Sequence, residues 1–159
     1  MYAPLAFLAT LLLSTAASAA PAATVGQARV VNNCAFDVSV WSVGSQVSDP
    51  HRLAAHGGSY AETFSRDPQT GGRVLKVTVP ADGLWTGAPQ TDFAYNLDGT
   101  QVWYDLSDVF GDPFAGHRLR VASAEGSCPA IDWASGTPPA GSQVKVCTST
   151  KDVTLTLCA

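Results

Sequence analysis

The chain has 159 residues, with 13 acidic and 9 basic side chains and a formal net charge of −4. Charged residues make up 14% of the chain, whereas soluble domains usually contain about 25%. The sequence contains no basic run or patch, which argues against nucleic acid as a partner. A low charge, together with many Gly, Pro, Ser and Thr residues, is typical of a secreted β-protein with few surface charges.

The N-terminal segment predicts secretion. Residues 5–13, LAFLATLLL, form an apolar run that is followed by small residues, and Ala17-Ser18-Ala19 fits the small-x-small pattern of a cleavage site. The run is too short to span a bilayer comfortably. We therefore expect a signal peptide at residues 1–19 and one soluble, extracellular and monomeric domain at residues 20–159, with no membrane partner.

The rest of the chain predicts strands rather than helices. Short runs that alternate apolar and polar residues are separated by turn signals, and no 12-residue window shows an apolar stripe of helical period. Residues 91–106 are predicted to form a β-hairpin, because the tight-turn pair Asp98-Gly99 separates two strand-like runs. Further strands are predicted in residues 36–43, 57–64, 71–79, 116–123, 142–148 and 152–159. The pattern indicates an all-β fold, a sandwich or barrel of antiparallel strands.

Four cysteines follow the predicted cleavage site, and an even number in a secreted chain indicates disulfides. Their spacing fits no zinc-binding pattern. Three pairings are possible, of which we prefer Cys34–Cys158 with Cys128–Cys147. The first would tie the opening strand to the last, and the second would close the loop formed by residues 129–146.

The segment WYDLSDVFGDPF, residues 103–114, places three aspartates among aromatic side chains. One interpretation is a glycoside hydrolase site, which needs two carboxylates, and Asp105 with Asp92 or Glu62 would supply them. Another is a calcium site made by Asp105, Asp108 and Asp112, although the closing Glu of a calcium loop is absent.

We favour a structural role for most of these acids, with Asp105 left as the one to test. In this interpretation Asp108 caps a short turn and Asp112 precedes Pro113 in another turn. Phe110 and Phe114 then fill the core. We predict no cofactor and no resident metal.

Three aromatic residues are candidates for ligand binding. Trp85, in DGLWTGAPQ, is expected on a loop, and it could form a sugar-stacking platform with Tyr104 and Trp133. The alternative, which we favour, is that each tryptophan packs against the base of its loop.

Several segments together resemble a known family. They are ARVVNNCAFDVSVWSVG, GGRVLKVTV, APQTDFAYNLDG, WYDLSDVFGDPFAGH and the terminal TLC. In this order they resemble thaumatin-like proteins, and most closely the small fungal secreted members called the Blastomyces yeast-phase-specific or antigenic thaumatin-like family. The resemblance implies a disulfide-stapled β-sandwich, the Cys34–Cys158 pair, secretion, and a role at the fungal surface or in host contact.

The resemblance carries over only part of the acidic cleft that larger plant members of this family build from an Arg, a Glu and several Asp residues. Asp105 falls on one Asp of that cleft. The position of the Glu falls near Ala94, a second Asp position falls on Phe110, and the Arg position falls near Lys76 or Val77.

Three function hypotheses follow, in order of preference. The first is a non-enzymatic protein that acts at the cell wall or the host interface by binding a wall glycan or a host extracellular protein, as an effector, an antigen or a wall-remodelling factor. The second is a β-glucan hydrolase of low activity that uses Asp105. The third is a structural antigen with no specific ligand.

Overall fold

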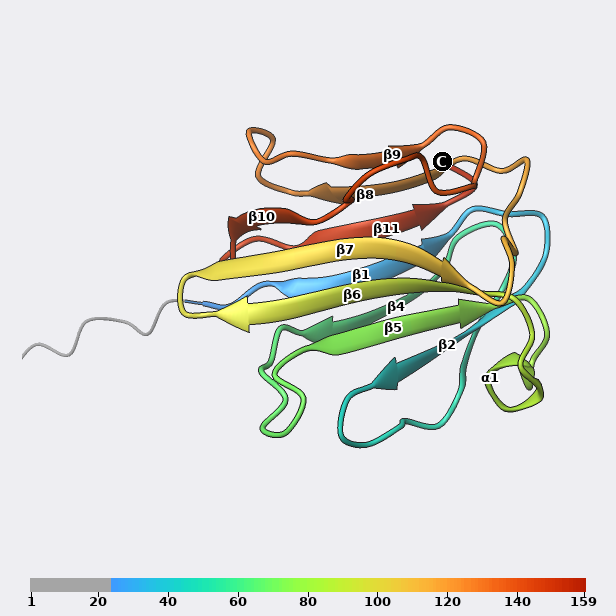
Figure 1. Ribbon diagram of the computed structural model, residues 1–159, viewed down its shortest axis with the longest axis horizontal. Coiled ribbons are helices and arrows are strands. Elements are labelled where there is room, and N and C mark those ends of the chain that lie inside the picture. The colour runs from blue at the N-terminus through green and yellow to red at the C-terminus, as the bar shows by residue number, and fades with distance from the viewer. Residues whose placement is uncertain (1–23) are drawn as a thin grey trace, which may run out of the picture.

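The computed structural model describes residues 24–159, so the predicted signal peptide at residues 1–19 lies outside the described residues. The described chain forms two facing β-sheets (Figure 1). One sheet has the order β4 (Gly58–Thr63), β1 (Gln27–Asn32), β11 (Val153–Leu157), β8 (Leu119–Ser123) and β9 (Ile131–Trp133). The other has the order β10 (Lys145–Thr148), β7 (Gln101–Val109), β6 (Gln90–Asp98), β5 (Arg73–Thr78), β2 (Val38–Val43) and β3 (His51–Leu53).

This architecture confirms the predicted all-β sandwich and the predicted hairpin. Strands β6 and β7 pair from Gln90↔Val109 to Asp98↔Gln101, which leaves Gly99 and Thr100 as the turn. Gly99 has a φ of 58°, a left-handed conformation that glycine adopts without a steric penalty.

Three short elements escape the sequence pattern. Strands β3 and β9 have three residues each, and the single turn of helix α1 (Gly83–Thr86) has four, which is too short to show a period. The strands are also not all antiparallel, because β1 and β11 pair in parallel. A parallel pair needs a long connection, and here most of the domain lies between its two strands.

The core lies between the two sheets and contains several fully buried aromatic side chains. They are Phe93, Tyr95, Tyr104, Phe114 and Trp133. Phe114 is thus in the core as predicted. The same prediction is wrong for Phe110, which is 70% exposed, because β7 ends at Val109 and Phe110 takes a φ of 61° that turns the chain out of the strand.

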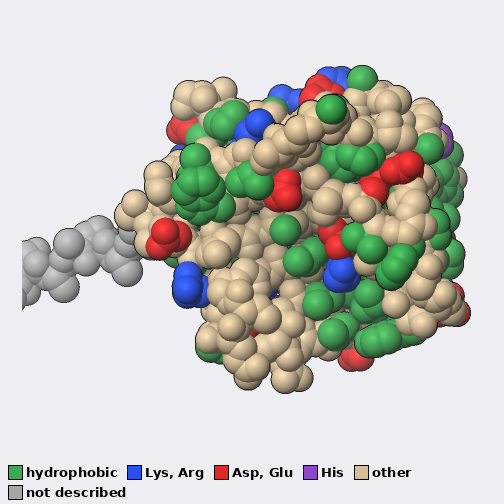
Figure 2. All heavy atoms as spheres, in the orientation of Figure 1, with side chains coloured by type: hydrophobic (Ala, Val, Ile, Leu, Met, Phe, Trp, Pro, Cys, Tyr) green, Lys and Arg blue, Asp and Glu red, His purple; other side chains and the backbone are tan. Residues whose placement is uncertain are grey.

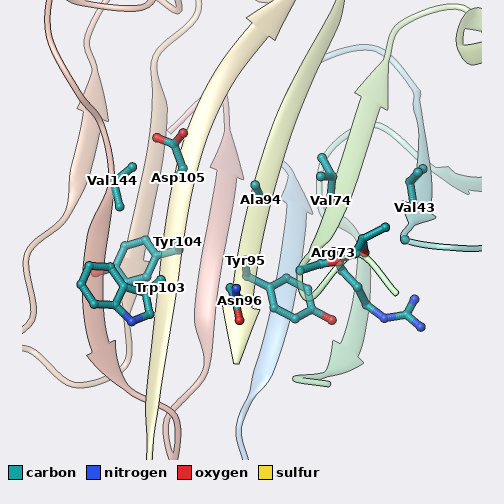
Figure 3. A pocket seen from close by; sticks show the side chains of 13 residues that line it. Val43, Arg73, Val74, Ala94, Tyr95, Asn96, Trp103, Tyr104, Asp105 and Val144 are labelled. Atoms are coloured by element: carbon teal, nitrogen blue, oxygen red, sulfur yellow. Dashed lines mark hydrogen bonds between the residues drawn. The ribbon is translucent and has the colours of Figure 1, made fainter. Parts of the chain in front are cut away.

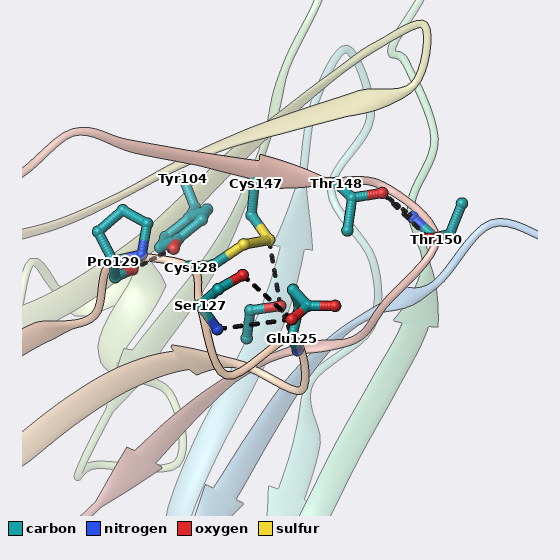
Figure 4. Close-up of a disulfide and its surroundings, with 9 residues drawn as sticks. Tyr104, Glu125, Ser127, Cys128, Pro129, Cys147, Thr148 and Thr150 are labelled. Carbon is teal, nitrogen blue, oxygen red and sulfur yellow. Dashed lines mark hydrogen bonds between the residues drawn. A yellow bond between two sulfur atoms is a disulfide. The ribbon is translucent and has the colours of Figure 1, made fainter.

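Both predicted disulfides are confirmed. Cys34 and Cys158 follow the neighbouring ends of β1 and β11, with their Cα atoms 5.1 Å apart. Cys128, in the loop between β8 and β9, is bonded to Cys147 on β10, and therefore links the two sheets (Figure 4). The described residues contain no free cysteine.

We expect the two disulfides to differ in their contribution to stability. They span 124 and 19 residues, and chain-entropy reasoning gives about 4–5 kcal/mol for the longer loop and about 3 kcal/mol for the shorter one. Urea unfolding of a Cys34→Ala/Cys158→Ala variant should therefore show a larger loss than a Cys128→Ala/Cys147→Ala variant. Equal or reversed losses would contradict the prediction.

Candidate functional site

The outer face of the six-stranded sheet, which points away from the core, carries a groove of about 500 Å³ (Figure 3). We call it the outer groove. It is lined by side chains from four neighbouring strands and the segment before β10, namely Val43, Val74, Ala94, Asn96, Trp103, Asp105 and Val144.

Strand register explains why these side chains meet. Ala94 lies opposite Asp105, and Asn96 lies opposite Trp103, in the β6–β7 ladder. Successive side chains of a strand point to opposite faces. Trp103 and Asp105 therefore share the outer face, while Tyr104 between them points into the core and is 1% exposed.

The outer groove combines an exposed aromatic surface with polar atoms that lack partners. Trp103 is 44% exposed, and the neighbouring Val144 is 47% exposed. Asn96 Oδ1 and Asp105 Oδ1 are buried, and neither has a hydrogen-bond partner among residues 24–159. Asn96 and Asp105 as whole side chains are only partly buried, so their exposed parts present polar groups to a ligand beside Trp103.

Asp92 shares this face with Asp105 but is already paired. It lies opposite Ser107. This pair is two residues along the ladder from the Ala94–Asp105 pair, and is therefore the next pair on the same face. Its Oδ2 atom is 2.7 Å from Nζ of Lys76 on β5. Burial raises the pKa of Asp92, while the hydrogen bond and the charge of Lys76 act in the opposite direction. Asp92 is therefore half of a buried ion pair rather than a free acid beside Asp105.

Glu62 lies on the other side of the sheet, so its predicted pairing with Asp105 is wrong. Its carboxylate accepts hydrogen bonds from the hydroxyl groups of Tyr60, at 2.8 Å, and of Tyr95, whose ring is in the core. Burial, followed by the Glu62 carboxylate, raises the pKa of Tyr60 to about 12. Glu62 thus joins the two sheets from within.

The structure also separates Asp105 from the other two predicted metal ligands. Asp108 lies opposite the buried Thr91 and accepts a hydrogen bond from its hydroxyl group at 2.5 Å, so it faces the opposite side of β7 from Asp105. Among residues 24–159, no three His, Cys, Asp or Glu side chains cluster in a way that could hold a metal ion.

The predicted turn roles of Asp108 and Asp112 have different outcomes. Asp108 anchors β7 to β6 instead of capping a turn. Asp112 does precede Pro113 in a turn as predicted, since its carbonyl oxygen accepts a hydrogen bond from the N–H of Ala115.

The proposed platform of three aromatic residues does not form. Tyr104 and Trp133 are each 1% exposed, with Tyr104 donating to the carbonyl oxygen of Pro129 and Trp133 Nε1 donating to Gln143 Oε1 at 3.3 Å. Trp133 is therefore packed at its loop, as the preferred alternative predicted. The same alternative is wrong for Trp85, which lies on α1 and is 68% exposed.

Sequence reasoning missed Trp103 and Asn96. The structure places the two-residue turn at Gly99-Thr100, one residue later than the predicted Asp98-Gly99 pair, and this register puts Asn96 opposite Trp103 and on the face of Asp105. Val144 follows the long loop after β9, and no signal in the sequence points to it.

The comparisons with known proteins identify the family. The model of the Blastomyces yeast-phase-specific protein family matches residues 15–159. The chain belongs to this family. It is 30% identical over 127 residues to the antigenic thaumatin-like protein of Arthroderma benhamiae, covering 77% of this chain and 63% of that protein. It is 28% identical over 149 residues to the secreted thaumatin-like protein calA of Emericella nidulans, covering 87% and 84% respectively.

Solved structures agree with the fold. The protein elicitor MoHrip2 from Magnaporthe oryzae superposes with a TM-score of 0.69 at 28% identity, covering 84% of this chain and 99% of that one. The thaumatin-like xylanase inhibitor TLXI superposes with a TM-score of 0.56 at 10% identity, covering 83% of this chain and 99% of that one. At this identity the similarity supports the fold alone. The relative named as secreted and the two disulfides agree with the extracellular location predicted from the sequence. Within residues 24–159, no helix is long and apolar enough to cross a membrane.

Asp67 holds together two loops at the rim of the outer groove. Its buried carboxylate accepts hydrogen bonds at 2.9–3.0 Å from the N–H groups of Ser45, Gln69 and Thr70 and from the Ser45 hydroxyl group. These bonds lower the pKa of Asp67 well below its usual range. The adjacent residues Gly44 and Thr70 line the groove.

We predict that Asp67→Asn lowers the melting temperature at neutral pH. A depressed folded-state pKa stabilises the protein above the unfolded pKa of about 4, and this contribution is lost as the pH falls below that value. Thermal melts between pH 2 and 7 should therefore show a shallower acid dependence in the variant than in the unmodified protein. Parallel curves would assign the hydrogen bonds no role in stability.

Asp108 should have the opposite pH dependence. Burial raises its pKa to about 7, the neighbouring Asp112 carboxyl group adds to the increase, and the Thr91 hydrogen bond opposes it. Between pH 4 and 7 the folded state then holds a proton that the unfolded chain has released, so stability falls as the pH rises through this window. Melting curves of Asp108→Asn should lack this decline, and a decline of unchanged size would contradict the assignment.

Proposed function

We propose that this protein is a secreted, non-enzymatic fungal protein that binds a neutral cell-wall polysaccharide in the outer groove. The observation that carries the proposal is the half-exposed Trp103 beside the partly exposed polar side chains of Asn96 and Asp105 on the same face of the sheet. The family membership and the two disulfides support an extracellular site of action. Removal of the predicted signal peptide at residues 1–19 is part of this proposal.

The chemistry of the groove suits a sugar chain. A sugar ring presents C–H groups on its faces and hydroxyl groups at its edges, so it can stack on an aromatic ring and donate hydrogen bonds to oxygen atoms nearby. Trp103 and the apolar side chains of Val43, Val74 and Val144 offer the stacking surface. Asn96 and Asp105 offer acceptors, and a few placed polar groups within an apolar lining are typical of ligand sites.

The arrangement of carboxylates favours binding over hydrolysis. Glycoside hydrolysis needs a pair of carboxyl groups that flank the scissile bond, one of which donates a proton. The aspartate nearest to Asp105 along this face of the ladder is Asp92, and Lys76 holds Asp92 in an ion pair. Glu62 is on the far side of the sheet.

Sedimentation with insoluble β-1,3-glucan and with chitin tests the proposal. The protein should sediment with at least one of them, and Trp103→Ala should weaken binding roughly tenfold, the upper range for loss of one aromatic contact. Asp105→Asn should weaken it as well. Trp85→Ala is the matched control, since it removes an exposed tryptophan outside the groove and should leave binding unchanged.

Two results would overturn the proposal. Binding to neither polysaccharide, with retention on host extracellular matrix instead, would favour the host-protein hypothesis. Release of reducing sugars from the glucan that is abolished in Asp105→Asn would favour the hydrolase hypothesis.

A further inference from the structure

We infer that the α1 end of the sandwich is a second binding surface, which docks a polypeptide segment carrying both apolar and basic side chains. This inference goes beyond the proposed glycan binding and is independent of it. The surface is made by Val79, Trp85, Pro89 and Phe110, and we call it the α1-end patch. Figure 2 shows hydrophobic side chains gathered at the end of the molecule where α1 lies.

The α1-end patch contains the two most exposed large hydrophobic side chains of the described residues. Phe110 is 70% exposed and Trp85 is 68% exposed, and Val79 is 38% exposed. Exposed aromatic side chains of this kind mark interaction surfaces when they lie together. Aromatic residues are also the commonest energetic anchors of protein interfaces.

A contact between the two loops places Phe110 next to the segment that follows α1. The pair Gln90↔Val109 ends the β6–β7 ladder, so Pro89 and Phe110 are the next residues outward on adjacent strands. A Cβ atom added to Gly111 would lie 3.3 Å from Pro89 Cγ. The turn that carries Phe110 therefore contacts Pro89, in the short segment that joins α1, which carries Trp85, to β6.

The backbone holds both aromatic side chains on well-defined supports. Phe110 has a φ of 61°, an uncommon conformation for a residue other than glycine, and this conformation keeps its ring out of the core. Helix α1 packs closely on β5, because a Cβ atom at Gly83 would lie 2.4 Å from Thr78 Oγ1. A backbone that is already ordered loses less conformational entropy on binding.

The charges around the patch indicate the kind of partner. Residues 79–89 and 109–116 include Asp82 and Asp112 but no Lys, Arg or His. Lys76, on the adjoining strand, is paired with Asp92. A negatively charged rim around an aromatic centre attracts basic groups and repels anionic lipid surfaces. A segment with lysine or arginine between apolar side chains fits both features.

Titration with short synthetic peptides, followed by NMR, tests this inference. The probes are three peptides of equal length that alternate Leu with Lys, Leu with Glu, or Gly with Lys. We expect the Leu–Lys peptide to shift the Trp85 indole N–H signal and the Phe110 amide signal, and the other two peptides to leave them in place. Added salt should weaken the interaction, since charged groups are screened.

Variants distinguish the patch from the outer groove. Trp85→Ala/Phe110→Ala should weaken Leu–Lys peptide binding at least tenfold, and Asp82→Asn/Asp112→Asn, which leaves the aromatic anchors in place, should weaken it several-fold. Trp103→Ala is the control and should bind the peptide as the unmodified protein does. Failure of glucan binding would leave these expectations untouched.

Several results would overturn the inference. They are equal binding of the Leu–Glu peptide, peptide-induced shifts at Trp103 instead of Trp85, and binding that survives in Trp85→Ala/Phe110→Ala. Shifts of the Trp85 signal by a β-1,3-glucan hexasaccharide but not by the peptide would make the patch a sugar site. Trp85-dependent sedimentation with phosphatidylserine vesicles would make it a membrane site.

Discussion

The turn at Gly99-Thr100 determines what the outer face of the protein presents. The left-handed conformation of Gly99 closes the β6–β7 hairpin in two residues and fixes the register of all nine pairs. A slip of one residue would move every side chain of a strand to the other face. It would bury Asp105 and expose Tyr104 and Leu106, so the core and the outer groove both depend on this turn.

The covalent links keep the two sheets in the arrangement that the hairpin requires. Cys34–Cys158 fastens the parallel pair β1 and β11 at one end, where the first and last strands of the domain lie side by side. Cys128–Cys147 crosses between the sheets at β10, next to the segment in which Val144 reaches the groove. The sandwich edge that borders Trp103 is therefore held covalently as well as by strand pairing.

Local features of the sequence predicted much of this structure, and long-range features could not be predicted. The Asp98-Gly99 pair and the alternating residues sufficed to predict a hairpin, because both features are contained in a few neighbouring residues, but its turn lies one residue later, at Gly99-Thr100. The parallel pairing of β1 with β11 and the packing of Glu62 against Tyr60 and Tyr95 depend on segments far apart in the chain. Alternation predicted an inward Phe110, and only the positive φ after Val109 reverses it.

The candidate site likewise combines features that a local motif predicts with features that depend on long-range packing. Asp105 was identified from its motif, but a motif does not reveal that Asp92 is neutralised by Lys76 or that Asp108 faces the other side of β7. The sequence does not distinguish the four aromatic residues Tyr104, Trp133, Trp103 and Trp85 from one another. Only the structure shows that Tyr104 and Trp133 are buried and that Trp103 and Trp85 are exposed. Which aromatic side chains remain available is decided by the packing of the two sheets, which the sequence pattern does not contain.

Strand β7 carries both proposed surfaces without making them compete. Trp103 and Asp105 project from its outer face, and Phe110 follows its end, about 17 Å beyond Asp105 at the usual rise of a strand. Between them β7 is paired with β6 along its whole length and with β10 at its start, so it acts as a rigid spacer. A sugar chain in the outer groove therefore leaves the α1-end patch uncovered. Under the two proposals, a single copy of this protein could hold a wall polysaccharide and a basic polypeptide segment at the same time, which neither surface could achieve alone.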